Sequence, residues 1–318
     1  MRKYIIHRLL QMIPTIFLVM FIAFALMKLI PGDPAAVMLG PQARAQDIMK
    51  LDKELGLDQP VMMQFLIYVK RAFSGDFGRS IIYGEPVFTL LLQRFPLTAL
   101  LSVMALSIAI IVAVPSGILA ALKQNSFVDY LITVFSLVGV STPIFWFGLM
   151  LMMVFSLYLH ILPSVGMGNG TLLDTFRHLI LPSISLALLS MGTIARVTRS
   201  SMLEVLRQDY VKTAYAKGLK KKTIIYRHML KNAMVPIITV SGLQLGNLLA
   251  GAVLTETIFG LPGMGRLMYD AILRRDFLVV QGGILFVAFI YIALNFSVDL
   301  LYAAFNPHIT SSYKGVAK

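Results

Sequence analysis

Ten Lys or Arg residues stand between positions 196 and 231, against only two acidic residues, Glu204 and Asp209. Most of this charge lies in the segment Lys212–Pro236, KTAYAKGLKKKTIIYRHMLKNAMVP. Ammonium and guanidinium groups at such a density attract acidic protein surfaces, anionic lipid headgroups or nucleic acid. The chemistry that this segment offers is therefore binding, and the rest of the sequence has to indicate the partner.

Catalytic and metal-binding patterns are missing from the sequence. The chain has no cysteine, which excludes disulfides, a thiolate nucleophile and cysteine metal sites. Its five histidines are scattered, so no metal site is predicted. The phosphate-binding pattern GxxxxGK[ST] does not occur, so the chain cannot bind ATP by that route.

An intramembrane serine protease is the enzyme class that has to be weighed. The sequence GVST at Gly139–Thr142 offers a GxS nucleophile pattern. Such an enzyme needs a histidine on a late span, whereas His228 lies in the basic segment and His308 lies beyond the last apolar run. We therefore predict that the chain is not an enzyme.

The composition indicates a membrane protein. Of the 318 residues, 58% are hydrophobic and 14% are charged, whereas a soluble domain has roughly 25% charged residues. A helix needs about 20 apolar residues to cross a bilayer. Six charge-free runs approach or exceed that length: Leu9–Met27, Leu97–Leu122, Tyr130–Leu159, Leu179–Ala195, Ala233–Thr255 and Phe277–Val298.

Two of these runs need comment. The first is longer than the roughly 7–15 apolar residues of a signal peptide, so we expect it to be a retained span. The third is too long for one straight span, and Ser141–Pro143 in its middle predicts a kink or a break there. The predicted fold is thus an all-α integral membrane protein with about six transmembrane helices.

The charge distribution predicts the orientation of these spans. Arg2, Lys3 and Arg8 precede the first span without an acidic residue, and the loop between spans four and five is strongly basic. The other two long connections carry equal numbers of basic and acidic residues. The positive-inside rule then places both termini and the basic loop in the cytoplasm.

The outward-facing segment 31–96 is predicted to form short helices. Ile48, Leu51 and Leu55 share one helical face before Gly56, and a second helix is expected to start near Asp58 and Pro60 and to run towards Phe73. GDFGRS at 75–80 is a turn cluster. The segment is either a folded cap on the membrane interface or a docking surface for a partner outside.

The basic loop has a helix–turn–helix pattern. Residues 201–218 have helical spacing, and Gly218 is where that helix is expected to end. A second helix is expected from about Ile224 into span five. Four roles compete: holding the topology, binding anionic lipid, binding nucleic acid and docking a cytoplasmic partner. Nucleic acid is disfavoured because stacking aromatic residues are not interleaved with the charges.

Several motifs resemble one family of membrane proteins. Thr213, Ala214 and Gly218 resemble the EAA loop of bacterial ABC-importer permeases, although Lys212 replaces the glutamate of that loop. TAYAKGL (213–219) and LKNAMVP (230–236) are similar to the dipeptide/oligopeptide/nickel subfamily. Six further motifs resemble that subfamily and follow the same order along the chain. They are IPGDPA (30–35), ELGLDQP (54–60), TPIFWFG (142–148), TRSSMLEVL (198–206), TETIFGLPGMGRL (255–267) and RRDFLVVQG (274–282). The long outer segment resembles the B-type permease of the pair.

The resemblance implies a type I ABC importer permease fold and a specific set of partners. These are a homologous second permease, two cytoplasmic ATPase subunits and an extracytoplasmic solute-binding protein, all at a bacterial inner membrane. ATP and Mg would be bound by the ATPases, and no cofactor by this chain. The implied domains are the cytoplasmic N-terminus with the first transmembrane helix (1–30), the extracytoplasmic helical segment (31–96), a membrane core (97–305) with a coupling loop at about 198–235, and a cytoplasmic tail (306–318).

The resemblance also implies roles for particular residues. The ATPase-coupling residues would be Lys212, Thr213, Ala214, Lys217, Gly218, Leu219, Arg227 and Asn232. Thr213 and Ala214 would permit close packing with the ATPase, and the lysines would pair with its acidic residues, unless they are solvated near lipid headgroups.

Two questions stay open at the outer and inner ends of the spans. Three roles compete for the group Glu256, Pro262 and Gly263: lining an outer gate, contacting the binding protein, or forming a structural turn. Asp299 near the inner end of the sixth span marks a pathway or, as we expect, is a partnered interfacial acid.

A secondary transporter or channel is the alternative class. It would be expected to carry charges within the membrane or an inverted repeat; the spans here are nearly charge-free. The substrate would be a di- or oligopeptide, a nickel chelate, glutathione or a related solute, and the low charge of the spans favours peptides.

Overall fold

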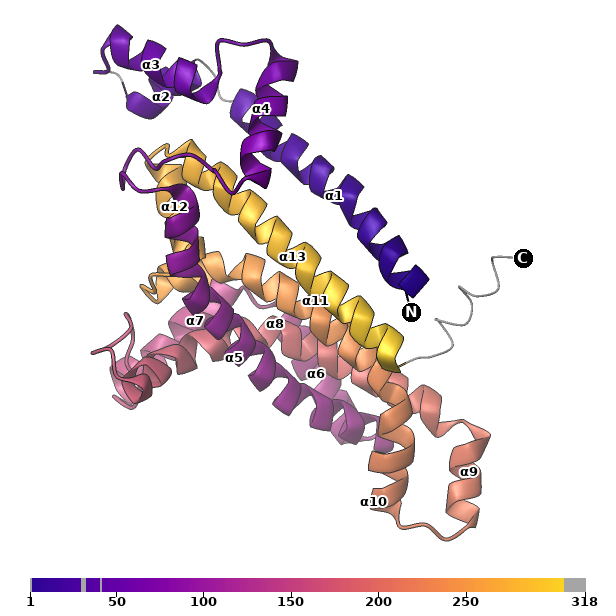
Figure 1. The fold of residues 1–318 in the computed structure, drawn as a ribbon. Coiled ribbons are helices and arrows are strands. Elements are labelled where there is room, and N and C mark those ends of the chain that lie inside the picture. Colours follow the sequence, from indigo (N-terminus) through magenta and orange to yellow (C-terminus); the bar gives the residue numbers. More distant parts are fainter. Residues whose placement is uncertain (1, 30–32, 41, 306–318) are drawn as a thin grey trace.

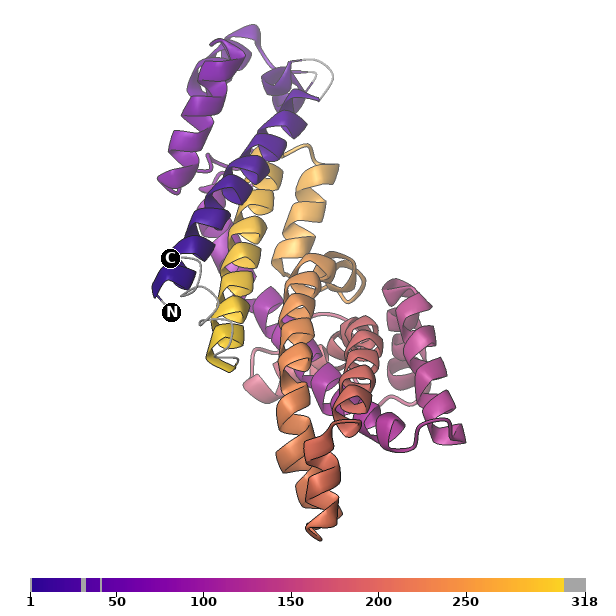
Figure 2. The same cartoon turned by 90° about the vertical axis from the view of Figure 1, so that its right-hand side faces the viewer.

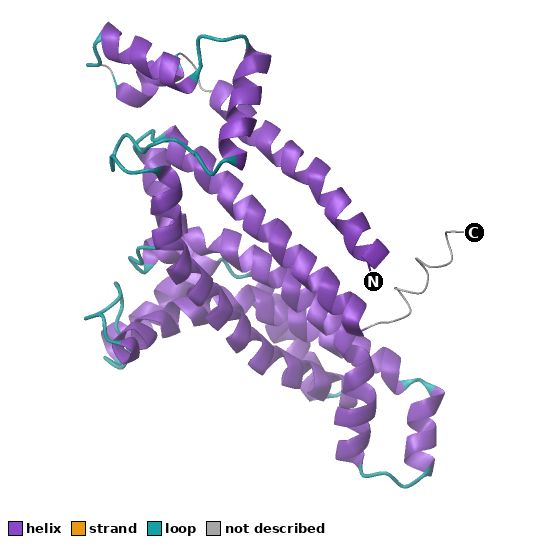
Figure 3. Cartoon of the chain, viewed as in Figure 1, coloured by secondary structure: helices purple, strands orange, loops and turns teal. Residues whose placement is uncertain are grey.

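The computed structural model describes residues 2–29, 33–40 and 42–305, and most of them are helical (Figures 1 and 3). Within this part there is no strand, only an isolated bridge between Arg79 and Pro86. The predicted tail 306–318, with His308, lies outside the described residues, as do the first three residues of the IPGDPA motif.

Five long helices are apolar enough to cross a membrane, and a bent pair makes a sixth span, as predicted. The five are α1 (Arg2–Lys28), α5 (Val87–Leu122), α8 (Leu172–Leu206), α11 (Leu230–Ile258) and α13 (Phe277–Phe305). The pair consists of α6 (Phe127–Ser141) and of α7 (Ile144–Leu151) continued by the π-helix η1 (Met152–Tyr158). The two halves meet at 104°, which confirms the predicted break at Ser141–Pro143.

The most extensive contact in the bundle joins α5 and α8 through small residues. Ala105, Ala109, Ala113 and Gly117 recur once per turn on α5 and are buried against α8. A Cβ atom on Gly117 would lie 2.6 Å from the carbonyl oxygen of Ala195. This small-residue spacing lets the two backbones approach closely, as is usual between helices in a membrane.

The first and last spans are antiparallel neighbours (Figure 1). Gln281 Nε2 on α13 donates to the carbonyl oxygen of Ala23 on α1 at 3.3 Å. Near the other end, Arg8 and Asp299 form an ion pair at 3.2 Å. The expectation that Asp299 is a partnered acid is confirmed.

The outer segment forms a helical cap of α2 (Pro34–Leu39), α3 (Ala45–Leu55) and α4 (Val61–Phe73). Gly56 ends α3 in the left-handed conformation, at φ +70°, and α4 follows after Pro60, as predicted. Phenylalanines attach α4 to the outer half of α1, with ring centroids 6.2 Å apart for Phe17–Phe73 and 5.4 Å for Phe24–Phe65.

A helical hairpin projects from the bundle at the end opposite the cap (Figures 1 and 2). We call residues 207–231 the elbow; it contains α9 (Asp209–Ala216), α10 (Lys221–Thr223) and the π-helix η2 (Ile224–Met229). The helix expected over 201–218 is interrupted at Arg207–Gln208, because Gln208 is extended and forms the N-cap of α9. The remaining helix, α12 (Met264–Leu273), lies between α11 and α13 at the cap end.

Candidate coupling site

The elbow has an apolar core of its own that joins it to the bundle. Val211 and Ala214 of α9 pack with Ile224, Ile225 and Met229 of η2, and all five are buried. The same cluster includes residues at the ends of three long helices: Ile118, Ala121, Met202, Ala233 and Ile237. Because burial continues from the hairpin into α5, α8 and α11, the elbow is a rigid extension of these helices.

Gly218 makes the turn between the two arms of the elbow. It has φ +70° and follows α9 with the two hydrogen bonds of a Schellman motif, Leu219 N–H to Ala214 O at 3.3 Å and Gly218 N–H to Tyr215 O at 2.9 Å. A Cβ atom at Gly218 would meet nothing within 4 Å. Glycine is therefore favoured here by its backbone conformation and not by lack of space.

The outer surface of the elbow is basic and contains exposed aromatic rings. Its lysines and arginines are all exposed, and Asp209 is its one acidic residue. Lys212 Nζ lies 2.8 Å from Asp209 Oδ1, and this hydrogen bond lowers the pKa of Asp209. Tyr210, Tyr215, Leu219 and Tyr226 expose 40–62% of their surface between the charges. The expectation that aromatic residues are not interleaved with these charges is therefore wrong. Tyrosine and arginine are enriched in protein–protein interfaces, so this surface suits an acidic protein partner.

Asn232 braces the two arms. Its side-chain amide donates to the hydroxyl of Tyr210 and to the carbonyl oxygen of His228, each at 2.9 Å. A cavity of about 330 Å³ lies between α8, α9 and α11 beside this brace, and Glu204 and Gln208 contribute to its lining.

Most of the predicted coupling residues face solvent. On the elbow, the exposed ones are Lys212, Thr213, Lys217, Gly218, Leu219 and Arg227, and Asn232 is exposed directly after it. Ala214 is 6% exposed and belongs to the elbow core. The coupling role of Ala214 stays a prediction, and in this conformation its side chain faces the elbow core. Its small side chain lets α9 pack on η2.

The predicted outer residues form part of a buried polar network. Glu256, on α11, is fully buried and accepts hydrogen bonds from the Thr98 hydroxyl at 2.5 Å and from the Arg266 N–H at 3.0 Å. Thr98 in turn accepts the N–H of Met264. The carboxylate thus caps the N-terminus of α12 and joins it to α5 and α11, so Glu256 cannot reach a binding protein in this conformation.

Gly263 and Pro262 have different surroundings. Gly263 is buried, and a Cβ atom there would collide with the Glu256 carboxylate. Pro262 is partly exposed; its carbonyl oxygen accepts from Arg94 Nη1 at 3.3 Å. It lines a cavity of about 490 Å³ together with Gln93, Leu97 and Met167. Of the three predicted residues, only Pro262 borders an open surface.

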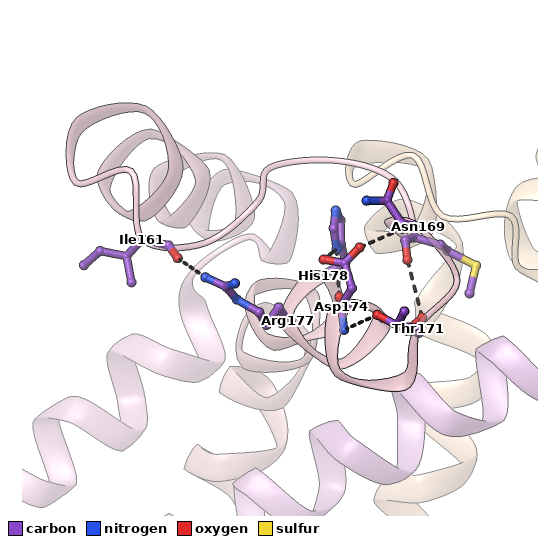
Figure 4. A network of polar contacts seen from close by, with 8 residues as sticks. Ile161, Asn169, Thr171, Asp174, Arg177 and His178 are labelled. Carbon is purple, nitrogen blue, oxygen red and sulfur yellow. Dashed lines mark hydrogen bonds and ion pairs between the residues drawn. The ribbon is translucent and has the colours of Figure 1, made fainter.

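The loop before α8 is held by the first turns of that helix (Figure 4). Asp174 Oδ2 accepts the N–H of Asn169 at 2.6 Å, Thr171 caps the helix, and Arg177 donates to the carbonyl oxygen of Ile161. His178 packs beside Asp174, with its Nδ1 3.5 Å from Asp174 Oδ1. The loop is fastened to the end of α11 by Gly166 N–H, which donates to Phe259 O.

Sequence reasoning missed an ion pair between α6 and α8. Arg199 binds Asp129 with two bonds, Nε to Oδ1 at 2.6 Å and Nη2 to Oδ2 at 2.7 Å, and the Asp129 side chain is 3% exposed. The available signal was one acidic residue, Asp129, directly before the third apolar run, and two arginines, Arg196 and Arg199, directly after the fourth run.

These features define a class of protein: an all-helical, multi-pass membrane protein whose bundle carries a rigid basic hairpin at one end and a helical cap at the other. Residues 113–311 match the family model of binding-protein-dependent transport system inner membrane components, and residues 1–103 match the model of the N-terminal part of such membrane components. The chain belongs to this family.

Similar proteins agree with this assignment. The chain is 46% identical to the di/tripeptide transport system permease protein DppB of Pseudomonas aeruginosa and 41% identical to the glutathione transport system permease protein GsiC of Escherichia coli. Each alignment covers 97% of this chain and 99% of the relative. The fold resembles the inward-facing MetNI methionine ABC transporter, with a TM-score of 0.56 at 14% identity over 68% of this chain and 96% of that one. The predicted ABC importer permease fold is confirmed.

Proposed function

We propose that this permease forms half of the translocation pathway of an ATP-driven importer for di- or oligopeptides or a related small solute. The peptide class rests on the names of the relatives, which include di/tripeptide and glutathione permeases. The second half of the pathway is a homologous permease. A solute-binding protein delivers the substrate at the cap end.

The energy comes from two ATPase subunits that bind the elbow. Support comes from two facts: the sequence has no phosphate-binding loop, and the elbow presents exposed tyrosines among positive charges. The observation that carries the proposal is the continuous apolar packing from α9 into α5, α8 and α11. A partner that moves the elbow therefore moves these helices with it.

Coupling then has a defined energetic requirement. ATP can shift the equilibrium between two conformations of the bundle only by the difference in free energy with which the ATPases bind these conformations. An almost complete shift needs a difference of about 5.5 kcal/mol. The elbow delivers that bias as a rigid-body displacement. The orientation that fits this role places the elbow and both termini in the cytoplasm, at the inner membrane of a bacterium.

The proposal is tested at Gly218 in the complex reconstituted into liposomes. Proline cannot adopt φ +70°, so Gly218→Pro should abolish uptake or separate it from ATP hydrolysis while the protein still inserts. Gly218→Asn is the matched control, because asparagine tolerates the left-handed conformation. Normal coupled uptake in Gly218→Pro, or uptake driven by an ion gradient without ATPase subunits, would refute the proposal.

A further inference from the structure

Two arginines of α8, Arg196 and Arg199, lie one helical turn apart and line a common cavity against α6. The cavity lies at the half of α8 that leads to the elbow. Arg196 stands ten residues before Leu206, the last residue of this helix. The cavity is separate from the elbow surface and from the buried network around Glu256.

The charges in this cavity do not balance. Asp129 is bound by Arg199 through two short hydrogen bonds and also accepts the N–H of Asn125 at 3.0 Å, so its acceptor capacity is largely used. Arg196 is exposed, and it forms no ion pair in the part of the chain that the structure describes. Two guanidinium groups against one carboxylate leave one net positive charge.

The other polar residues of the cavity carry hydroxyl groups. Thr133 and Ser136 of α6 also line the cavity, and Ile132, Leu137 and Ala195 complete the lining. The cavity has a volume of about 160 Å³, which exceeds what one water needs. Guanidinium and hydroxyl donors around an uncompensated positive charge suit an anion with several oxygen atoms, such as a phosphate group.

The cavity borders an apolar surface. Helix α6 packs mainly on α8 and α5, and its other side exposes Tyr130, Leu131, Val134, Phe135, Leu137 and Val138. Leu137 belongs both to this surface and to the cavity lining. In a multi-pass membrane protein such a surface suits acyl chains, so the positive cavity and the apolar face together match a phosphate group with attached hydrocarbon.

We propose that the Arg196 cavity binds the phosphate headgroup of an anionic membrane phospholipid, with the acyl chains lying along α6. A basic pocket between membrane helices is a physically suitable headgroup site, and one Lys or Arg contributes about 1 kcal/mol near an anionic membrane surface. Arg196 should therefore give about a fivefold preference for an anionic over a zwitterionic lipid.

Tryptophan fluorescence can test this preference, because the chain has one tryptophan, Trp146. In a Trp146→Phe background, Leu137→Trp places the fluorophore at the cavity. The complex with its partner subunits is reconstituted with brominated phosphatidylglycerol or brominated phosphatidylcholine, and the signal of the same complex carrying Trp146→Phe alone is subtracted to remove the tryptophans of the partners. We expect brominated phosphatidylglycerol to reach a given degree of quenching at about one fifth of the mole fraction that brominated phosphatidylcholine needs.

Matched variants distinguish the cavity from general surface charge. Arg196→Gln should remove the preference, and Arg196→Lys should keep it because the charge is retained. Arg207→Gln loses the same charge from an exposed position of the elbow and should leave the preference unchanged. Circular dichroism of each variant checks that the helices are intact.

Four results would overturn the proposal. Equal quenching by both lipids would exclude a headgroup preference, and a preference that survives Arg196→Gln or disappears in Arg196→Lys would exclude this charge as its source. Absence of quenching by either lipid would show that protein covers α6. Loss of the preference on addition of inorganic phosphate would show that the site takes a free anion.

Discussion

Thr213 and Ala214 are adjacent in the sequence but occupy opposite environments. Thr213 faces solvent, and its hydroxyl donates to the carbonyl oxygen of Asp209 at 3.0 Å. Ala214 is buried among the apolar residues of the elbow core. One residue of the pair is thus available to a partner, and the other determines how closely the two arms pack.

We predict that Ala214→Leu and Thr213→Leu have different consequences. The added side chain at 214 overpacks the elbow core and should destabilise the protein by about 1–3 kcal/mol. At 213 it stays in solvent, so stability should change by less than about 0.5 kcal/mol while ATPase binding weakens. Thermal unfolding and ATPase pull-down measure the two effects, and equal stability losses in both variants would contradict the assigned burial.

Glu256 provides a second prediction at this scale. Its carboxylate accepts from the Thr98 hydroxyl and from backbone N–H groups at the start of α12. An amide in its place would turn an NH₂ group towards a donor and leave a buried group unsatisfied, at a cost of about 1–3 kcal/mol. Glu256→Gln should lower the melting temperature and speed amide hydrogen exchange in α12. Unchanged exchange in α12 would show that the carboxylate does not cap this helix.

Helix α11 connects the two functional ends of the molecule. It begins at Leu230, at the end of the elbow, and carries Glu256 near its other end, about 39 Å away at 1.5 Å per residue. Since both ends are fixed by buried contacts, displacement of the elbow is expected to act on α12 and on the turn at Pro262. A role of Pro262 in an outer gate, one of the three alternatives that the sequence left open, would depend on this connection.

Glycine substitutions test the packing between helices. A Cβ atom on Gly117 would lie 2.6 Å from Ala195 O and from Thr198 Cβ, whereas one on Gly251 of α11 would meet nothing within 4 Å. Gly117→Ala should push α5 and α8 apart and destabilise the protein by about 1–3 kcal/mol. Gly251→Ala should be neutral or stabilise by up to about 1 kcal/mol, because alanine favours helix more than glycine.

Thermal unfolding of both variants in the same detergent is the measurement. The two substitutions add the same methyl group to a membrane helix, so a common effect on the bilayer or the detergent cancels. A melting temperature that falls equally in both would mean that the close approach at Gly117 is not what stabilises the pair.

At the scale of the whole molecule, the sequence predicted the spans well because absence of charge is a local property. It placed six spans, the break near Pro143, the ends of the cap helices and the turn at Gly218. Helix ends were less predictable: α8 begins at Leu172, before the apolar run at Leu179, because a helix can continue beyond the hydrocarbon region where polar side chains reach water.

Contacts between distant residues could not be predicted from the single sequence. Asp129 and Arg199 are 70 positions apart, and Thr98 and Glu256 are 158 apart. Such pairs depend on how the helices pack. For the same reason the pattern around Gly218 identified the elbow but not the side on which Ala214 lies.

The orientation of the molecule can be tested directly, because the chain contains no cysteine and a single introduced thiol is the only one. Asp47 in the cap and Lys221 in the elbow are both exposed. In intact spheroplasts, a membrane-impermeant maleimide should label Asp47→Cys and not Lys221→Cys, and permeabilisation should make both react. The unmodified chain gives the background. Labelling of Lys221→Cys from outside would place the elbow on the wrong side of the membrane for a cytoplasmic ATPase, and the positive charge of the elbow would then need another explanation.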